Sequence, residues 1–334
     1  MITLGVETSC DETAVALLKD GREVLADVVL TQTQAHERFG GVVPEIASRN
    51  HLQHLLPCLE EALKKAQKTL AEVALYAVTA GPGLQGALLV GVLAAKTLAR
   101  TYGRPCIGIN HLEGHVLAIL LAKEPPEVPF LSLVVSGGHT HLFAVEAVGR
   151  YRQVASTRDD AAGEAFDKVA RLLGLPYPGG AQVDKLAQRG NPKAFAFPRA
   201  LKGKQEYNFS FSGLKTAVSH AIAEEGPPKG QRLYDLCASF QEAVADALTR
   251  KWTAAAQQLG FKAVALGGGV AANSRLRSLA AERAKAAGLR LHLPEPSLCT
   301  DNAAMVAVAG YEAYRRNEES GMALDARPAW RLGG

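Results

Sequence analysis

Two segments of this chain share one strand–turn–strand design, and this repetition restricts the possible folds more than any other feature. Leu4 to Leu18 has a strand pattern, a polar turn and a second strand pattern, and Leu131 to Val145 repeats that order. Each turn is rich in hydroxyls, glycines or backbone N–H groups that can face a phosphate. One copy alone would be an ordinary β-hairpin, because Gly-Gly is a common hairpin turn. Two copies predict a duplicated architecture with a ligand cleft between its halves.

The remaining pattern predicts an α/β protein with two lobes. Short apolar strand patterns alternate with helix-length amphipathic segments. A chain of 334 residues with 48% hydrophobic composition can bury a large core. The Pro-rich stretch Pro125 to Pro129 directly precedes the second hairpin and is a natural lobe boundary. We expect a first lobe of residues 1–115 with 303–334 and a second lobe of residues 116–302.

Composition excludes several classes of protein. Charged residues make up 21% of the chain and are mixed in sign, which argues against disorder. The five cysteines are scattered and never form C-x-x-C, which argues against a disulfide framework or zinc ribbon and favours a reducing cytosol. No basic segment precedes the first strand, and the longest apolar stretch, Gly86 to Ala95, is about half a membrane span. We therefore expect a soluble, cytoplasmic protein with no membrane partner.

A pair of histidines is the first candidate metal site. His111 and His115 lie four residues apart, so on a helix they share one face with Cβ atoms about 5–6 Å apart. Glu113 lies between them, which matches neither H-E-x-x-H nor H-x-x-E-H of zinc peptidases. The pattern predicts a metal anchor without a built-in general base, and a chance pair among nine histidines is the alternative.

Asp301 is the candidate third ligand. It lies in Cys299-Thr300-Asp301-Asn302, directly before a predicted helix from Ala303 to Arg315. Two imidazoles and one carboxylate suit Fe(II), Zn or Mn and leave coordination positions open for a substrate. The alternative is that Thr300 or Asp301 simply caps the helix.

Two glycine-rich loops are candidate nucleotide-binding segments, and one basic loop is a candidate RNA-binding segment. Gly81 to Gly86 matches G-x-G-x-x-G, but no acidic residue ends the next strand, so tight packing is favoured over a dinucleotide site. Gly267 to Gly269 end a predicted strand, and a predicted helix follows. The free N–H groups at the start of that helix could bind a nucleotide. The alternative is a plain turn between strand and helix. The segment Asn191 to Asn208 holds aromatic residues and four cations, which are Lys193, Arg199, Lys202 and Lys204. This composition suits contact with an RNA backbone and stacking on its bases. The alternative is a solvated loop anchored by its aromatic residues.

These segments together resemble the TsaD family, also called Gcp or YgjD, nearly from end to end. The motifs are Gly5–Thr13, Gly40–Glu45, Ala80–Leu84, His111–His115, Val135–Thr140, Gly163–Lys168, Tyr177–Gly180, Phe209–Thr216, Gly267–Asn273 and Cys299–Met305. Asn208 departs from the pattern, because an acidic residue often stands there in relatives, and it lies outside the proposed site. The likeness is to the bacterial branch. It implies an actin/Hsp70/sugar-kinase-like (ASKHA) fold with duplicated βαβ-type cores.

The resemblance also implies a reaction and partners. Threonylcarbamoyl-AMP, made by a separate TsaC/Sua-type synthase, would give its threonylcarbamoyl group to N6 of the adenosine just 3′ of the anticodon. This forms t6A in tRNAs that read codons beginning with A and releases AMP. The implied partners are the TsaB paralogue, which pairs through the N-terminal lobe, and the ATPase TsaE. The alternatives are a metallopeptidase, an ASKHA-type ATPase or sugar kinase, and a scaffold of a tRNA-modification complex.

The resemblance and the residue chemistry assign roles to particular residues. His111, His115 and Asp301 would hold one divalent metal ion, Fe²⁺ or Zn²⁺. Asp11 and Glu12 are candidates for receiving the amine proton, or they order the turn or bind a second cation. An apolar face for TsaB, or a buried core face, would consist of Ile46, Leu52, Leu55 and Leu59. The residues implied to surround the adenylate are Val134, Val135, Ser136, Gly137, Gly138, Asp167, Gly180, Asp184 and Asn273.

Overall fold

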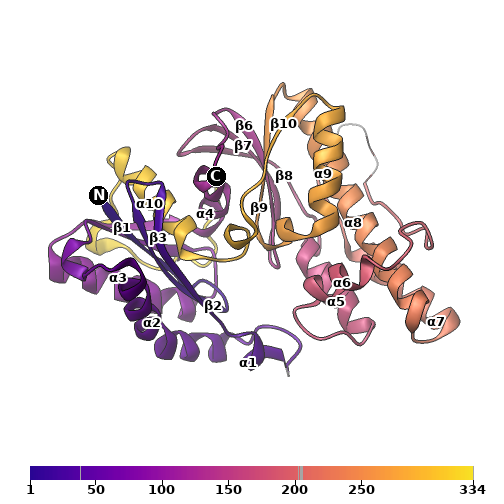
Figure 1. Ribbon diagram of the computed structural model, residues 1–334, viewed down its shortest axis with the longest axis horizontal. Helices are drawn as coiled ribbons and strands as arrows, with labels where there is room; N and C mark the ends of the chain where they lie inside the picture. The colour runs from indigo at the N-terminus through magenta and orange to yellow at the C-terminus, as the bar shows by residue number, and fades with distance from the viewer. Residues whose placement is uncertain (38, 202, 204–205, 334) are drawn as a thin grey trace. The chain divides into compact units, whose positions relative to one another are not determined.

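The chain divides into two compact units. The computed structural model describes residues 1–334 apart from 38, 202, 204–205 and 334. Unit 1 comprises Met1–Pro125, Ala147–Tyr151 and Asp301–Gly334, and unit 2 comprises Pro126–Glu146 and Arg152–Thr300 (Figure 1). The lobe limits predicted from the sequence, at 115/116 and 302/303, stay a prediction.

Unit 1 is built on a sheet with the strand order β3-β2-β1-β4-β5. Its strands are β1 (Ile2–Glu7), β2 (Glu12–Lys19), β3 (Glu23–Thr31), β4 (Leu75–Gly81) and β5 (Cys106–Asn110). β1 and β2 form the first predicted hairpin, with Gly5 opposite Ala16, whereas β1, β4 and β5 run parallel. All of β4 is buried, because it pairs with parallel strands on both sides and helices cover both faces of the sheet.

Different helices cover the two faces of this sheet. Leu4 and Val6 of β1 pack in one apolar cluster with Leu55 of α2 (Pro44–Ala66) and Val92 of α3 (Gln85–Tyr102). Figure 1 shows α2 and α3 running together along that side. On the other face, a Cβ added to Gly5 would lie 2.3 Å from the carbonyl oxygen of Ala303, the first residue of α10 (Ala303–Arg315). α10 has the bounds predicted from the sequence, and it packs directly against the backbone of the hairpin.

Unit 2 repeats the strand order of unit 1 around a second hairpin. Its sheet has the order β10-β9-β6-β7-β8, with β6 (Phe130–Val135), β7 (Thr140–Ala147), β8 (Arg150–Ser156), β9 (Ala263–Gly267) and β10 (Arg290–His292). β6 pairs antiparallel with β7 and parallel with β9, as β1 does with β2 and β4. The predicted duplication is therefore present in the topology.

The helices of unit 2 enclose a core that includes the fully buried Trp252, whose Nε1 donates to Leu131 O at 3.4 Å. They are α5 (Ala162–Leu172), α6 (Gly179–Ala187), α7 (Ser212–Glu225), α8 (Gly230–Gln258) and α9 (Ser274–Ala286). The short elements of the chain are α1 (Thr33–Glu37), α4 (His111–Leu117), η1 (Leu70–Glu72), η2 (Ala118–Leu121), η3 (Gly269–Ala272), η4 (Pro296–Leu298) and η5 (Gly321–Ala323). Within the described residues, no helix combines the length and apolar character that crossing a membrane requires.

Candidate functional site

The first candidate site lies in unit 1, where β5 passes directly into α4. The side chain of Asn110 accepts a hydrogen bond from Leu112 N at 2.9 Å and so caps the start of α4. One helical turn then brings His111 and His115 to the same face, with ring centroids 4.7 Å apart and the rings nearly perpendicular. Both rings are buried. The sequence prediction of a paired face is confirmed.

Asp301 lies beside the two histidines and does not cap α10. Asn302 is the N-cap, and its side chain accepts from Met305 N at 2.8 Å. The helix-cap alternative for Asp301 is therefore wrong. Its carboxylate Oδ1 lies 3.0 Å from His115 Nε2 and 3.7 Å from His111 Nε2. The candidate ligand atoms of these three residues all lie within 4.8 Å of one another.

The donor set fits one divalent cation. Both Nε2 atoms face the same carboxylate oxygen, so an ion placed among them would meet two imidazoles and a carboxylate. His111 Nδ1 lies 3.0 Å from Glu7 Oε2, which requires Nδ1 to carry the proton and leaves Nε2 as the ligand atom. His115 Nδ1 is buried and has no hydrogen-bond partner among the described residues.

Glu7 is a functional residue that the sequence reasoning missed. Its carboxylate is fully buried and also accepts from Ser9 N at 2.6 Å and from Thr79 Oγ1 at 2.6 Å. Burial raises the pKa of Glu7, but the charge and hydrogen bond of His111 more than offset this, so its pKa is lowered. Burial lowers the pKa of His111, and the Asp301 and Glu7 carboxylates more than offset that effect and raise it to about 9. The signal in the sequence was an acidic residue ending an apolar strand.

Glu113 does not belong to the metal set. Its Oε1 accepts a hydrogen bond from Tyr151 OH at 2.8 Å and lies 3.7 Å from Arg316 Nη2. Burial raises the pKa of the Glu113 carboxyl. This carboxylate therefore serves a structural network, and it is not placed as the general base of a zinc peptidase.

Asp11 ends the turn between β1 and β2, and Glu12 follows it. Asp11 is buried, and Glu12 is the first residue of β2. Burial, followed by the charges of Asp301 and Asp11, raises the pKa of Glu12 well above its usual value. A carboxyl group with a raised pKa suits proton transfer near neutral pH, although the roles of both residues stay predictions.

The glycines of the loop Gly81 to Gly86 allow close packing, but the contacts of Gly81 and Gly83 are with loop segments and not between a strand and a helix. A Cβ added to Gly81 would lie 1.9 Å from Arg327 O, and one added to Gly83 would lie 2.5 Å from Ser9 O. Leu84 N donates to Ser9 O at 2.8 Å. These glycines let the loop contact the first hairpin turn and the C-terminal segment of unit 1.

The predicted phosphate turn lies in unit 2 between β6 and β7. Val134 and Val135 end β6, and Ser136 N donates to His139 O at 2.8 Å to close the turn. In the described part of the chain, nothing lies within 4 Å of a Cβ built on Gly137 or Gly138. The backbone of these two glycines is thus accessible to a ligand.

The remaining predicted substrate residues lie on helices of unit 2: Asp167 within α5, Gly180 and Asp184 on α6, and Asn273 at the N-cap of α9. Asp167 Oδ1 accepts from Gly179 N at 2.8 Å, which ties α5 to the start of α6 beside Gly180. Asp184 accepts from the Ser274 hydroxyl at 2.6 Å and from Ser274 N at 3.1 Å. Asn273 caps α9 and donates from Nδ2 to Gln241 Oε1 at 2.9 Å. Asp184 and Asn273 therefore lie together, and their contacts with substrate stay predictions.

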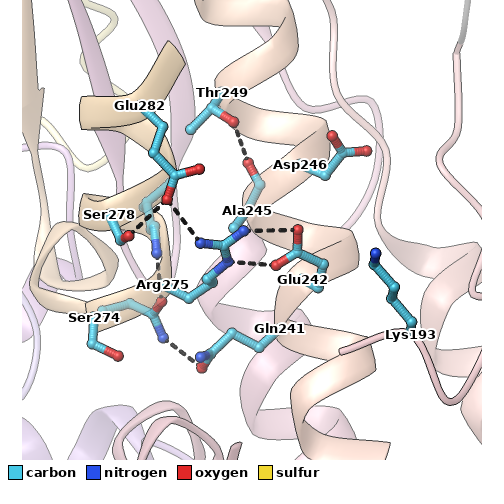
Figure 2. Close-up of polar contacts among 12 residues, drawn as sticks. Lys193, Gln241, Glu242, Ala245, Asp246, Thr249, Ser274, Arg275, Ser278 and Glu282 are labelled. Carbon is cyan, nitrogen blue, oxygen red and sulfur yellow. Dashed lines mark hydrogen bonds and ion pairs between the residues drawn. The ribbon is translucent and has the colours of Figure 1, made fainter. Parts of the chain in front are cut away.

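A cavity of about 230 Å³ adjoins the start of α9, and its lining comprises Ala187, Gln188, Pro192, Ala238, Gln241, Glu242, Ser274, Arg275 and Ser278. Figure 2 shows the Arg275 guanidinium between two carboxylates, which the sequence reasoning did not identify. Its Nε and Nη2 lie 2.5 Å and 3.1 Å from the Glu242 oxygens, and Nη1 lies 3.2 Å from Glu282 Oε1. Two carboxylates therefore already pair with the Arg275 cation at the edge of this cavity.

The basic loop from Asn191 to Asn208 is only partly described, because Lys202 and Lys204 lie outside the described residues. Arg199 pairs with Asp246 at 3.1 Å. Phe197, inside the loop, and Phe209, directly after it, are buried in the core of unit 2. Stacking of these two rings on RNA bases is therefore a wrong interpretation, because they anchor the loop instead.

The fold defines a class of protein. Two units with the same strand order, each starting from a hairpin, are typical of ASKHA folds, and solved structures agree. The chain is similar to (R)-2-hydroxyglutaryl-CoA dehydratase component A of Acidaminococcus fermentans, with TM-score 0.57 and 16% identity over 94% of this chain and 99% of that chain. It is also similar to full-length HypF, with TM-score 0.60 and 14% identity over 96% of this chain and 47% of that chain. At these identities the likeness concerns the fold alone.

Sequence comparison identifies the family. The family TsaD, tRNA N6-adenosine threonylcarbamoyltransferase, matches residues 23–308. The chain is 56% identical over 330 residues to the tRNA N6-adenosine threonylcarbamoyltransferase of Anaeromyxobacter dehalogenans (strain 2CP-C), covering 98% of this chain and 99% of the relative. The chain therefore belongs to the TsaD family. The predicted family, fold class and enzyme class, an acyltransferase, are confirmed.

Proposed function

We propose that this chain transfers the threonylcarbamoyl group from threonylcarbamoyl-AMP to N6 of the adenosine just 3′ of the anticodon. The product is t6A in tRNAs that read codons beginning with A, and AMP leaves. Family membership along nearly the whole chain supports the reaction. The structural observation that carries it is the set of His111, His115 and Asp301, with Glu113 bonded to Tyr151 instead of serving as the base of a peptidase motif. We do not favour a metallopeptidase activity. We also do not favour an ATPase or scaffold role as the only function of the chain.

The metal in this proposal is Fe²⁺ or Zn²⁺, held by His111, His115 and Asp301. When bound, it would supply a Lewis acid with open positions for substrate oxygens. The protein residues prepare that site: Glu7 fixes the tautomer of His111, and Asn302 caps α10 so that Asp301 faces the imidazoles.

We assign the adenylate to unit 2. The Ser136 hydroxyl and the N–H groups of Gly137 and Gly138 would donate to the acyl-phosphate. The carboxylate oxygens of Asp167 and Asp184 can accept hydrogen bonds from ribose hydroxyls. The cavity beside Arg275 would take the uncharged adenine, since its cation is already paired. The similar HypF is described in a phosphate- and nucleotide-bound form, which supports a nucleotide on this fold.

The N6 amine of the acceptor adenosine is a poor nucleophile. Its lone pair is delocalised into the adenine ring, so rate enhancement must come from positioning and from stabilising the developing charge. Asp11 and Glu12 are the proposed acceptors of the amine proton. Burial and neighbouring carboxylates raise the pKa of Glu12, and a carboxylate with a raised pKa is a stronger base.

The proposed protein partners are TsaB and TsaE, with a separate synthase supplying the adenylate. We place TsaB on the outer face of α2 and α3, where Leu52, Leu56 and Leu93 are 66%, 65% and 57% exposed. Leu56 also lines an apolar hollow of about 220 Å³, together with Leu55 and Leu59. Of the face predicted from the sequence, Leu52 is available to a partner, whereas Leu55 and Leu59 belong to the core.

Reconstitution tests the proposal. The chain is combined with the synthase, TsaB, TsaE, tRNA and labelled threonine, and omitting the chain should abolish labelled t6A. His111→Ala and Asp301→Ala should each remove stoichiometric metal and transfer activity together, because each removes a ligand. The matched control is His220→Ala, which removes an exposed histidine of α7. Retained metal in both ligand variants would contradict the assignment, and t6A formed without the chain would refute the function.

A further inference from the structure

The turn that carries Asp11 and Glu12 is fixed from three directions. Its consecutive carbonyls each meet a donor from a different element. Ser9 O accepts from Leu84 N at 2.8 Å, and Asp11 O accepts from Gln32 N at 3.2 Å. Cys10 O lies 3.0 Å from His51 Nε2, on α2. Of these three donors two are backbone N–H groups, so the histidine is the one that a side-chain substitution can remove.

The contacts of His51 determine its tautomer. A carbonyl oxygen can only accept, so Nε2 must carry the proton that is donated to Cys10 O. Nδ1 is then an acceptor, and Thr13 Oγ1 lies 2.8 Å from it. The ring has no exposed surface, and burial lowers the pKa of His51, so it is neutral at pH 7. One neutral ring therefore bridges Cys10 and Thr13, the two residues that flank Asp11 and Glu12.

We propose that His51 is a positioning residue for the transfer reaction. Its Nε2–H holds the peptide plane between Cys10 and Asp11 and so sets the direction of the two carboxylates. The inference rests on the proposed role of Asp11 and Glu12 as proton acceptors. The cost of losing a positioning group of this kind appears in kcat, because the substrates still bind while the reacting groups are misaligned.

Two substitutions separate the donor from the rest of the side chain. In His51→Gln the amide nitrogen can take the place of Nε2 and still donate to Cys10 O. In His51→Asn the shorter amide reaches only the position of Nδ1, so the contact with Cys10 O is lost. We expect His51→Asn to lower kcat by roughly 10- to 100-fold with little change in KM for tRNA or the adenylate, and His51→Gln to restore most of it.

Several controls keep this test decisive. His54→Asn is the matched control on the same helix and should keep wild-type kcat. Metal content and melting temperature are measured for every variant. If His51→Asn does not fold, Thr13→Val replaces it, with Thr13→Ser as its control, because loss of the Thr13 hydroxyl removes the 2.8 Å contact with Nδ1 and leaves the ring the longer contact with Gln32 Nε2, at 3.5 Å.

Three outcomes would overturn the inference. The first is wild-type kcat in folded, metal-loaded His51→Asn. The second is an equal loss in the Asn and Gln variants that follows their loss of melting temperature, which indicates a structural role only. The third is unchanged turnover in both Asp11→Asn and Glu12→Gln, which removes the role that His51 would support. That result leaves the transfer reaction itself standing, because reconstitution tests it separately.

Discussion

The buried carboxylate of Glu7 shows how single residues set the chemistry of unit 1. It accepts hydrogen bonds from His111, Ser9 and Thr79, which come from three separate parts of the chain. A carboxylate behind a metal-binding histidine fixes the ring and raises its basicity as a ligand. The residue is therefore part of the candidate metal centre although it is not a ligand.

Glu7→Gln tests this role. The amide keeps the size of the side chain but weakens the acceptor and removes the charge that favours the Nδ1–H form of His111. We expect metal affinity to fall by roughly 10- to 100-fold. Competition with a chelator of known affinity measures it. Glu23→Gln, an exposed glutamate of β3, is the control, and wild-type affinity in Glu7→Gln would count against the arrangement.

Among the elements of unit 1, α2 has two faces with different tasks. Its inner face contributes Leu55, Leu59 and His51 to the core and to the hairpin turn, whereas Leu52 and Leu56 extend outward. An apolar helix face that stays exposed in a single chain is typical of a protein interface. This element therefore links the proposed TsaB face to the proposed catalytic turn.

Leu52→Asp combined with Leu56→Asp should disrupt association with TsaB. Each substitution removes an apolar contact of about 1.5 kcal/mol or more and places a charge in the interface. Together this corresponds to at least about 100-fold weaker binding. Titration calorimetry measures the change, and Leu259→Asp, at a residue 40% exposed at the end of α8, is the control. Unchanged affinity would move the interface elsewhere.

For the whole molecule, the two sheets have the same strand order, and each unit contributes a different type of site. Unit 1 holds the candidate metal-ligand set, whereas unit 2 holds the turn and the helix residues predicted to meet the adenylate. The net charge of +4 is modest for a protein that acts on tRNA. RNA binding must therefore depend on local groups of cations rather than on overall charge.

Lys202→Ala combined with Lys204→Ala tests the basic loop as part of the tRNA footprint. Both lysines lie outside the described residues, so this prediction rests on the sequence. We expect weaker tRNA binding at low salt and a log–log salt slope reduced by about one to two units. Filter binding over a range of salt concentrations measures both. Lys19→Ala with Lys65→Ala, exposed lysines of unit 1, is the control, and an unchanged slope would exclude the loop.

Local patterns in the sequence determined the hairpins, the bounds of α10 and the shared face of His111 and His115. They did so because strand alternation, helix period and motif spacing act over a few residues. The family followed from motifs along the whole chain. The ligand role of Asp301 was different, since a carboxylate before a helix can equally be a cap. Only the tertiary structure excluded the cap role, because Asn302 caps the helix and Asp301 lies beside the imidazoles, where the ligand role stays a proposal. The same holds for Glu7 and His51, because hydrogen bonds between distant segments depend on how the elements pack, which local periodicity does not encode.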